Sequence, residues 1–175
     1  MEGAALTADA RFRAPLVVVT VLVLHLAVLS RLRVFGVTPD VMLLLAVAAG
    51  LRGGPSAGAA MGFTSGMAVD LFLDTPLGLS ALVFTLVGFA MGTVGTGILR
   101  AAWWIPVVAA FVASAAGEAF FAVAGYLVGQ TEMVTARLAL IAPVVGVLNA
   151  VLAPPVVRMA GWALVRSPGP RAFVG

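Results

Sequence analysis

The chain of 175 residues lacks cysteine and lysine, and His25 is its single histidine. Without cysteine, disulfides, thiolate nucleophiles and thiolate metal sites are all excluded. A single histidine also excludes a metal site built from several histidine ligands. Charged side chains are scarce as well, at 10% of the residues, where a typical soluble domain has about 25%. These shortages exclude several kinds of active site and point away from a soluble protein.

Motifs of common enzyme classes are also missing. The sequence contains no H-E-x-x-H zinc motif, no phosphate-binding glycine loop and no dinucleotide fingerprint. We therefore predict a protein that is not an enzyme, with no catalytic residue, no cofactor and no metal site.

Apolar residues are abundant, at 62% of the chain with a mean hydropathy of +1.16. This composition predicts an all-α integral membrane protein, since a helix needs about 20 apolar residues to cross a bilayer. We expect a bundle of six transmembrane helices over residues 14–30, 39–51, 55–73, 79–99, 103–128 and 138–157. The expected parts are a cytoplasmic tail (1–13), a six-helix membrane domain (14–165) and a disordered cytoplasmic tail (166–175).

Two of these segments are unusual. The second opens with Pro39 and Asp40, a helix-start motif with proline in the first turn and an acid at the positive helix end. It extends only to Leu51, or about 20 Å of helix, so we expect either that it lies among the other helices or that the bilayer thins around it. The last segment contains a proline pair at residues 154–155, which should kink or end that helix before a short interfacial helix.

The arginines set the expected orientation. If the N-terminus is cytoplasmic, seven of the ten lie on the inner side, which favours cytoplasmic N- and C-termini. The inner arginines are Arg11, Arg13, Arg52, Arg100, Arg158, Arg166 and Arg171, and the outer ones are Arg31, Arg33 and Arg137. Because all ten lie at segment ends, no basic patch remains for a nucleic acid.

Glycines recur at every fourth position of the third segment, at Gly54, Gly58, Gly62 and Gly66. This spacing places them on one helix face, where a neighbouring backbone can approach closely. Two explanations stay open: tight packing within this bundle, or a contact face for a helix of another protein.

Four polar residues, His25, Asp70, Glu118 and Asn149, lie within the apolar segments and could converge, because intramembrane ionisable groups usually face the bundle interior or a water-filled cavity. Asp70 has three possible roles: pairing with an outer arginine, capping the backbone after the turn at residues 74–76, or binding a substrate or partner. Glu118 is a candidate for a proton relay. His25 and Asn149 are expected to be hydrogen-bonded packing residues.

Several short motifs also follow one another along the chain. They are Pro39-Asp40 before a leucine run, Gly53-Gly54-Pro55, Gly62-Phe63 with Asp70-Leu71, Pro76-Leu77-Gly78-Leu79, and Asn149-Ala150-Val151-Leu152-Ala153-Pro154. With this series, from about residue 14 to 165, the chain resembles the MreD family of rod shape-determining proteins.

The resemblance implies a non-enzymatic, multi-pass subunit of the bacterial cell-elongation (rod) complex in the cytoplasmic membrane. The implied direct partner is MreC. Indirect partners are MreB, the glycosyltransferase RodA and a class B penicillin-binding transpeptidase, which together serve cell-shape control and peptidoglycan synthesis. The family fold also resembles the substrate-capture subunits of energy-coupling-factor transporters. We single out as partner-binding or structural residues Gly58, Gly62, Gly66, Asp70 and Gly78.

A second hypothesis is a small-molecule-binding membrane subunit of a vitamin-type transporter. It would use a polar cavity formed by His25, Asp70, Glu118 and Asn149. The chain has a single tyrosine, Tyr126, and few hydrogen-bonding side chains in its helices. Because small-molecule sites need a few well-placed polar groups, the first hypothesis is favoured.

Overall fold

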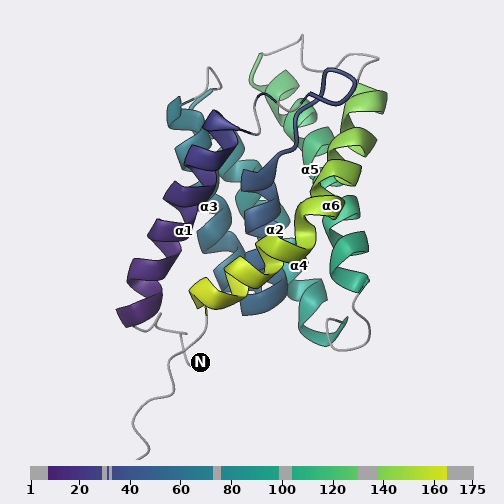
Figure 1. Cartoon of the computed structure of the whole chain (residues 1–175). Helices are drawn as coiled ribbons and strands as arrows, with labels where there is room; N and C mark the ends of the chain where they lie inside the picture. The colour runs from purple at the N-terminus through teal and green to yellow at the C-terminus, as the bar shows by residue number, and fades with distance from the viewer. Residues whose placement is uncertain are drawn as a thin grey trace, which may run out of the picture.

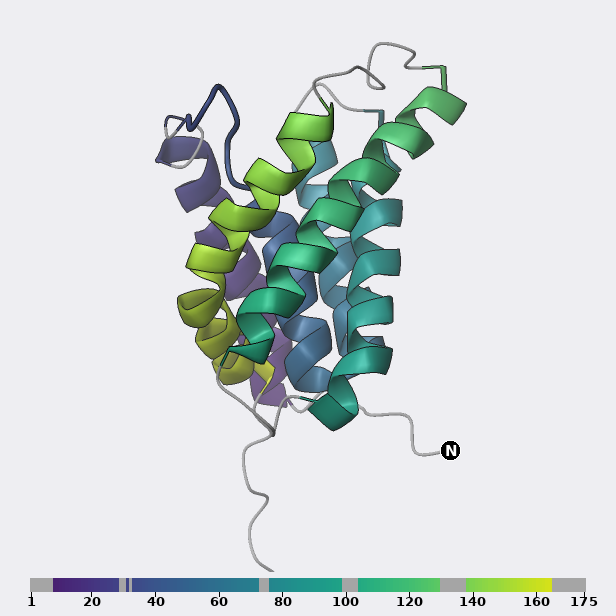
Figure 2. The ribbon, with the colours of Figure 1, turned by 90° about the vertical axis from the view of Figure 1, so that its right-hand side faces the viewer.

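The computed structural model describes residues 8–28, 31, 33–72, 76–98, 104–129 and 138–164. Within these ranges the protein is a bundle of six helices (Figures 1 and 2). They are α1 (Ala8–Ala27), α2 (Val41–Gly53), α3 (Pro55–Phe72), α4 (Leu79–Ile98), α5 (Ile105–Leu127) and α6 (Leu138–Leu164). The β-type pairing in the described part is an isolated bridge between Val34 and Val37. The predicted all-α class is confirmed.

The short helix α2 occupies the centre of the bundle, which agrees with the first of the two sequence-based alternatives. All eleven residues from Val41 to Leu51 are buried, and α2 contacts each of the other five helices. Its start differs slightly from the prediction, because Pro39 lies outside the helix and Asp40 is the N-cap. The Asp40 carboxylate accepts a hydrogen bond from the Leu43 N–H at 2.9 Å.

The first helix begins earlier than the sequence predicted. Helix α1 begins at Ala8, inside the stretch predicted as a tail, and the Arg13 guanidinium lies 5.1 Å from the centre of the Trp162 ring. This cation–π contact joins the start of α1 to the end of α6. Residues 1–7 and the predicted tail 166–175 lie outside the described residues.

Helix α6 does not end at its proline pair, so the predicted separate interfacial helix is wrong. Pro154 and Pro155 lie inside one continuous helix to Leu164. The ribbon changes direction in its yellow half (Figure 1), which agrees with the predicted kink. Prolines remove backbone N–H donors and bend a helix, but the packing of its two halves against neighbours can keep it continuous. Here α6 packs against α5, α2 and α1.

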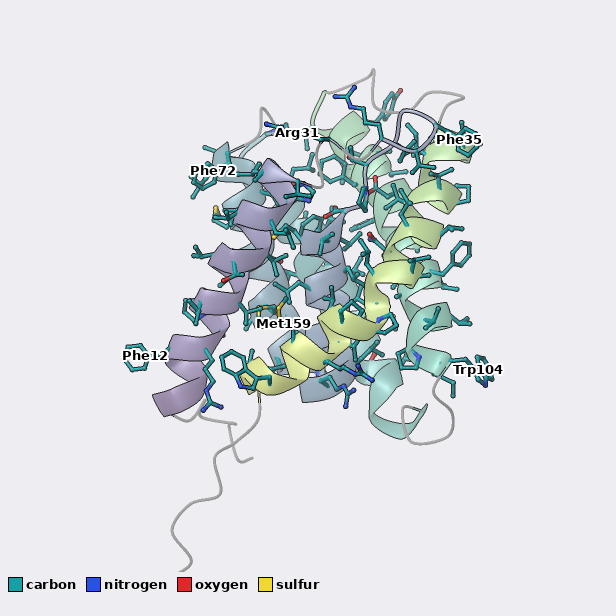
Figure 3. All side chains as sticks on the ribbon, viewed as in Figure 1. Phe12, Arg31, Phe35, Phe72, Trp104 and Met159 are labelled. Carbon is teal, nitrogen blue, oxygen red and sulfur yellow. The ribbon has the colours of Figure 1, made fainter. Side chains whose placement is uncertain are left out.

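The outside of the bundle is apolar. Large hydrophobic side chains are exposed on α1, α3, α4, α5 and α6, and Phe12, Phe72 and Trp104 point away from the bundle (Figure 3). Helices α5 and α6 are each long and apolar enough to cross a bilayer. An apolar exterior of this extent suits lipid rather than water, so the fold is that of a helical membrane protein.

Candidate functional site

Helices α3 and α4 make a close backbone contact, and they make it through the glycine face. A methyl group added to Gly58, Gly62 or Gly66 would overlap backbone atoms of α4. The overlaps are Gly58 with Gly88, Gly62 with Phe84, and Gly66 with Ala81. Helix α4 of the same chain therefore covers this face, which is not free to receive a helix from another protein.

Asp70 lies one turn beyond this glycine face and connects the end of α3 to the start of α4. Its carboxylate accepts three backbone hydrogen bonds, from Gly78 at 2.9 Å and from Ser80 and Ala81 at 3.2 Å each. The Ser80 and Ala81 N–H groups belong to the first turn of α4, which has no partners for them within the helix, and the Gly78 N–H lies in the turn just before it. A negative charge at the positive end of a helix is also favourable. Asp70 thus acts as an N-terminal cap supplied by the preceding helix.

The turn before α4 explains the glycine at position 78. Gly78 has a backbone φ of +91°, in the left-handed region that side chains disfavour. This conformation directs its N–H to the buried Asp70 carboxylate. Gly78 and Asp70 therefore form one structural unit.

Asn149 joins three parts of the chain. Its amide Nδ2 donates to the Asp40 carbonyl oxygen at 2.8 Å and to the Ser114 Oγ at 2.9 Å. The side chain is fully buried, so these bonds hold α6 to α5 and to the start of α2. Interhelical amide bonds of this kind stabilise membrane bundles.

A cavity of about 700 Å³ lies beside this junction. It is lined by His25, Phe35, Gly36, Val37, Thr38, Pro39, Asp40, Leu43, Val69, Ser80, Phe84, Gly117, Glu118, Phe121, Leu140, Ile141 and Val145. The lining comes from the end of α1, the 35–40 segment, and parts of α2 to α6. The exposed Phe35 stands at its rim, at the opposite end of the bundle from Phe12 near the start of α1 (Figure 3).

The structure does not bring the four intramembrane polar residues to one site. His25 and Glu118 line the cavity, whereas Asp70 and Asn149 do not. Asp70 is occupied with the turn before α4, and Asn149 with the α2–α5–α6 junction. Asp40 also lines the cavity, a position that its helix-start motif did not predict.

The described residues give no support to a catalytic or metal centre. No group of three His, Asp, Glu or Cys side chains within them could hold a metal ion. The letters of the G-x-S-x-G hydrolase pattern do occur at residues 54–58. That pattern needs a strand-to-helix turn and a histidine partner, but Ser56 lies in the first turn of α3 in a helical bundle. The match therefore carries no hydrolase prediction.

Comparison with known proteins gives one family. The family model described as rod shape-determining protein MreD matches residues 10–160. This span includes every residue of the α3–α4 contact, the Asn149 junction and the cavity. No curated protein and no solved structure shows a match.

Proposed function

Because the chain belongs to the MreD family of rod shape-determining proteins, we propose that it is a non-enzymatic, multi-pass subunit of the bacterial cell-elongation (rod) complex. The family match over residues 10–160 is the observation that carries this proposal. In the proposed complex the chain binds MreC directly in the cytoplasmic membrane. Through MreC it is connected to MreB, RodA and a class B penicillin-binding transpeptidase, and so to peptidoglycan synthesis.

The physical character of the bundle supports an interaction role. The α3–α4 contact, the Asp70 cap and the Asn149 junction all use polar or small residues for internal packing. The exposed surface then consists largely of apolar side chains that can contact lipid or another membrane helix. A bundle without an energy source can transmit a signal only by a change in helix packing when a partner binds.

The proposed orientation has six membrane-inserted helices with both termini in the cytoplasm. The contact between Arg13 and Trp162 supports placing the start of α1 and the end of α6 at one end of the bundle. The 35–40 segment and the turn at Leu77 would then face the extracytoplasmic side.

Single cysteines introduced into this cysteine-free chain test that orientation. In intact cells we expect Leu77→Cys to react with a membrane-impermeant maleimide, because Leu77 is exposed in the turn before α4. Arg158→Cys, near the other end, should react only after the membrane is permeabilised. The unmodified chain is the blank, and the reverse labelling pattern would contradict the orientation.

The partner proposal is tested by recovering the tagged chain from its native membranes in a mild detergent. We expect mass spectrometry to identify MreC together with the elongation synthases, and a tagged unrelated multi-pass protein serves as the control. Absence of MreC under conditions that keep the bundle intact would overturn the proposal. The transporter alternative gains no support from the family match, and only recovery of an ATPase pair with a coupling subunit would favour it.

A further inference from the structure

The cavity beside the Asn149 junction has no part in the proposed scaffold role. Most of its wall is apolar, with Leu43, Val69, Phe84, Phe121 and Val145 among its lining residues. Three ionisable side chains, His25, Asp40 and Glu118, also face it. Its volume of about 700 Å³ lies within the range of small-molecule sites. A cavity of this size and mixed lining is suited to an amphipathic molecule.

The two acidic groups lack sufficient hydrogen-bond donors. Asp40 lines the same cavity as Glu118 and His25. The Asp40 carboxylate accepts a hydrogen bond from the Leu43 N–H, and no hydrogen bond to the Glu118 carboxyl group is seen within the described residues. Neighbouring carboxylates repel each other, and a partly buried acid with few donors is less favourable than one in water. A ligand that supplies positive charge and several donors would remove both costs.

A second and independent observation concerns His25. Its Nδ1 atom is buried and has no hydrogen-bond partner among the described residues. A buried nitrogen of this kind normally has a partner in the protein or in a bound molecule. The His25 side chain lies in the cavity wall with the two acids. The cavity wall therefore contains a nitrogen without a hydrogen-bond partner as well as the two acids.

We propose that this cavity binds the primary ammonium group of an amphipathic amine. The ammonium group donates to Asp40 and Glu118, and the apolar body lies along Phe84, Phe121 and Val145. A primary ammonium has three N–H donors, which match two carboxyl groups, whereas a quaternary ammonium has none. Phenylalanine rings also attract a cation. An anionic ligand is disfavoured because the described part of the lining contains two acids and no arginine.

The ammonium group could come from a membrane lipid or from a soluble amine. Both sources present the same chemistry to the acidic pair. The inference does not depend on MreC binding, so the partner experiment above and the ligand experiment below can fail separately.

The test uses the full chain purified in mild detergent with four probes. Dodecylamine and dodecanol share an apolar tail and differ in the ammonium group. Phosphatidylethanolamine and phosphatidylcholine differ in whether the ammonium is primary or quaternary. Binding is measured by titration calorimetry for the single-chain probes and by native mass spectrometry for the lipids. We expect dodecylamine to bind at least about tenfold more tightly than dodecanol, because charge-assisted hydrogen bonds are the strong ones.

Two variants place the binding in the cavity. Glu118→Gln removes one carboxylate and is expected to weaken dodecylamine binding at least about tenfold. Ile141→Trp keeps both acids and fills space in the cavity, so it should weaken binding as well. The control is Tyr126→Phe, which removes an exposed polar group from the same helix as Glu118 and should bind as the unmodified chain does. A thermal melt of each protein verifies that it is folded.

Retention of phosphatidylethanolamine over phosphatidylcholine identifies a lipid source, and tight binding of dodecylamine without lipid retention identifies a soluble amine. Equal affinity of the unmodified chain for dodecylamine and dodecanol, with no preference between the lipids, would overturn the proposal even if a variant failed to fold. Selective binding that survives both cavity variants would place the amine elsewhere and would overturn it too.

Discussion

Replacing Gly62 with alanine is expected to disrupt the bundle, whereas the same replacement at Gly161 should be tolerated. A methyl group at Gly62 would overlap the Phe84 carbonyl of α4, which is backbone and cannot move aside without separating the helices. At Gly161 the nearest atoms are side-chain atoms of Arg52 at 3.8–4.0 Å, an ordinary contact distance. Both sites are helical, so alanine should favour each helix locally by about 1 kcal/mol.

We expect Gly62→Ala to lower the free energy of unfolding by more than about 4 kcal/mol, because overpacking against a rigid backbone is among the most destabilising changes. The measurement is thermal unfolding of the detergent-solubilised protein, with size-exclusion profiles to detect aggregation. Gly161→Ala should leave the unfolding midpoint unchanged or slightly raised. Equal midpoints for the two variants would show that α3 and α4 are not held at the observed separation.

Removing the Asp70 carboxylate is the second change with a large expected effect. Asp70→Ala leaves the N–H groups of Gly78, Ser80 and Ala81 without their acceptor at the buried start of α4. Unsatisfied buried donors cost about 1–3 kcal/mol each, so we expect a total loss of about 3 kcal/mol or more. Asp70→Asn keeps one acceptor oxygen and loses the charge, so its effect should be smaller and membrane insertion should be preserved.

Hydrogen exchange shows where the loss occurs. Amide exchange at residues 78–81 should become faster in Asp70→Ala, while exchange in α2 should change little. Thr64→Val is the control, because the Thr64 hydroxyl bonds to carbonyl groups of its own helix, at Ala60 and Met61. If exchange at 78–81 is unaltered in Asp70→Ala, Asp70 does not hold the turn.

Much of the fold could be predicted from composition and spacing alone. The apolar content and the segment lengths gave the helices, and the shortness of the second segment gave its central position, because a helix of about 20 Å cannot cross lipid alone. Helix ends were predicted less well. The continuation of α6 past Pro154 and Pro155 depends on its packing against α2 and α1, and a sequence pattern does not contain such contacts.

The site was predictable only in part, for a related reason. Asp70 stood out because an acid is costly within an apolar segment, but its partners at residues 78–81 depend on the geometry of the turn. The grouping of Asp40 with Glu118 and His25 depends on how three helices converge. The helix-start motif already explained why an acid stands at Asp40. Its place in the cavity wall therefore could not be recognised from the sequence.

During insertion into the membrane, α2 has no stable place of its own in lipid. It is too short to span the bilayer. Its buried residues, Val41–Leu51, pack against α1 and against four helices that are synthesised later, α3 to α6. Gly54 alone separates it from α3, so we expect the two helices to enter the membrane as a hairpin. The order of synthesis therefore matters. We expect α2 to reach its final packed position only after α4 and α6 have been synthesised and can surround it. Truncation within α6 would remove part of that enclosure and expose α2 to membrane quality control.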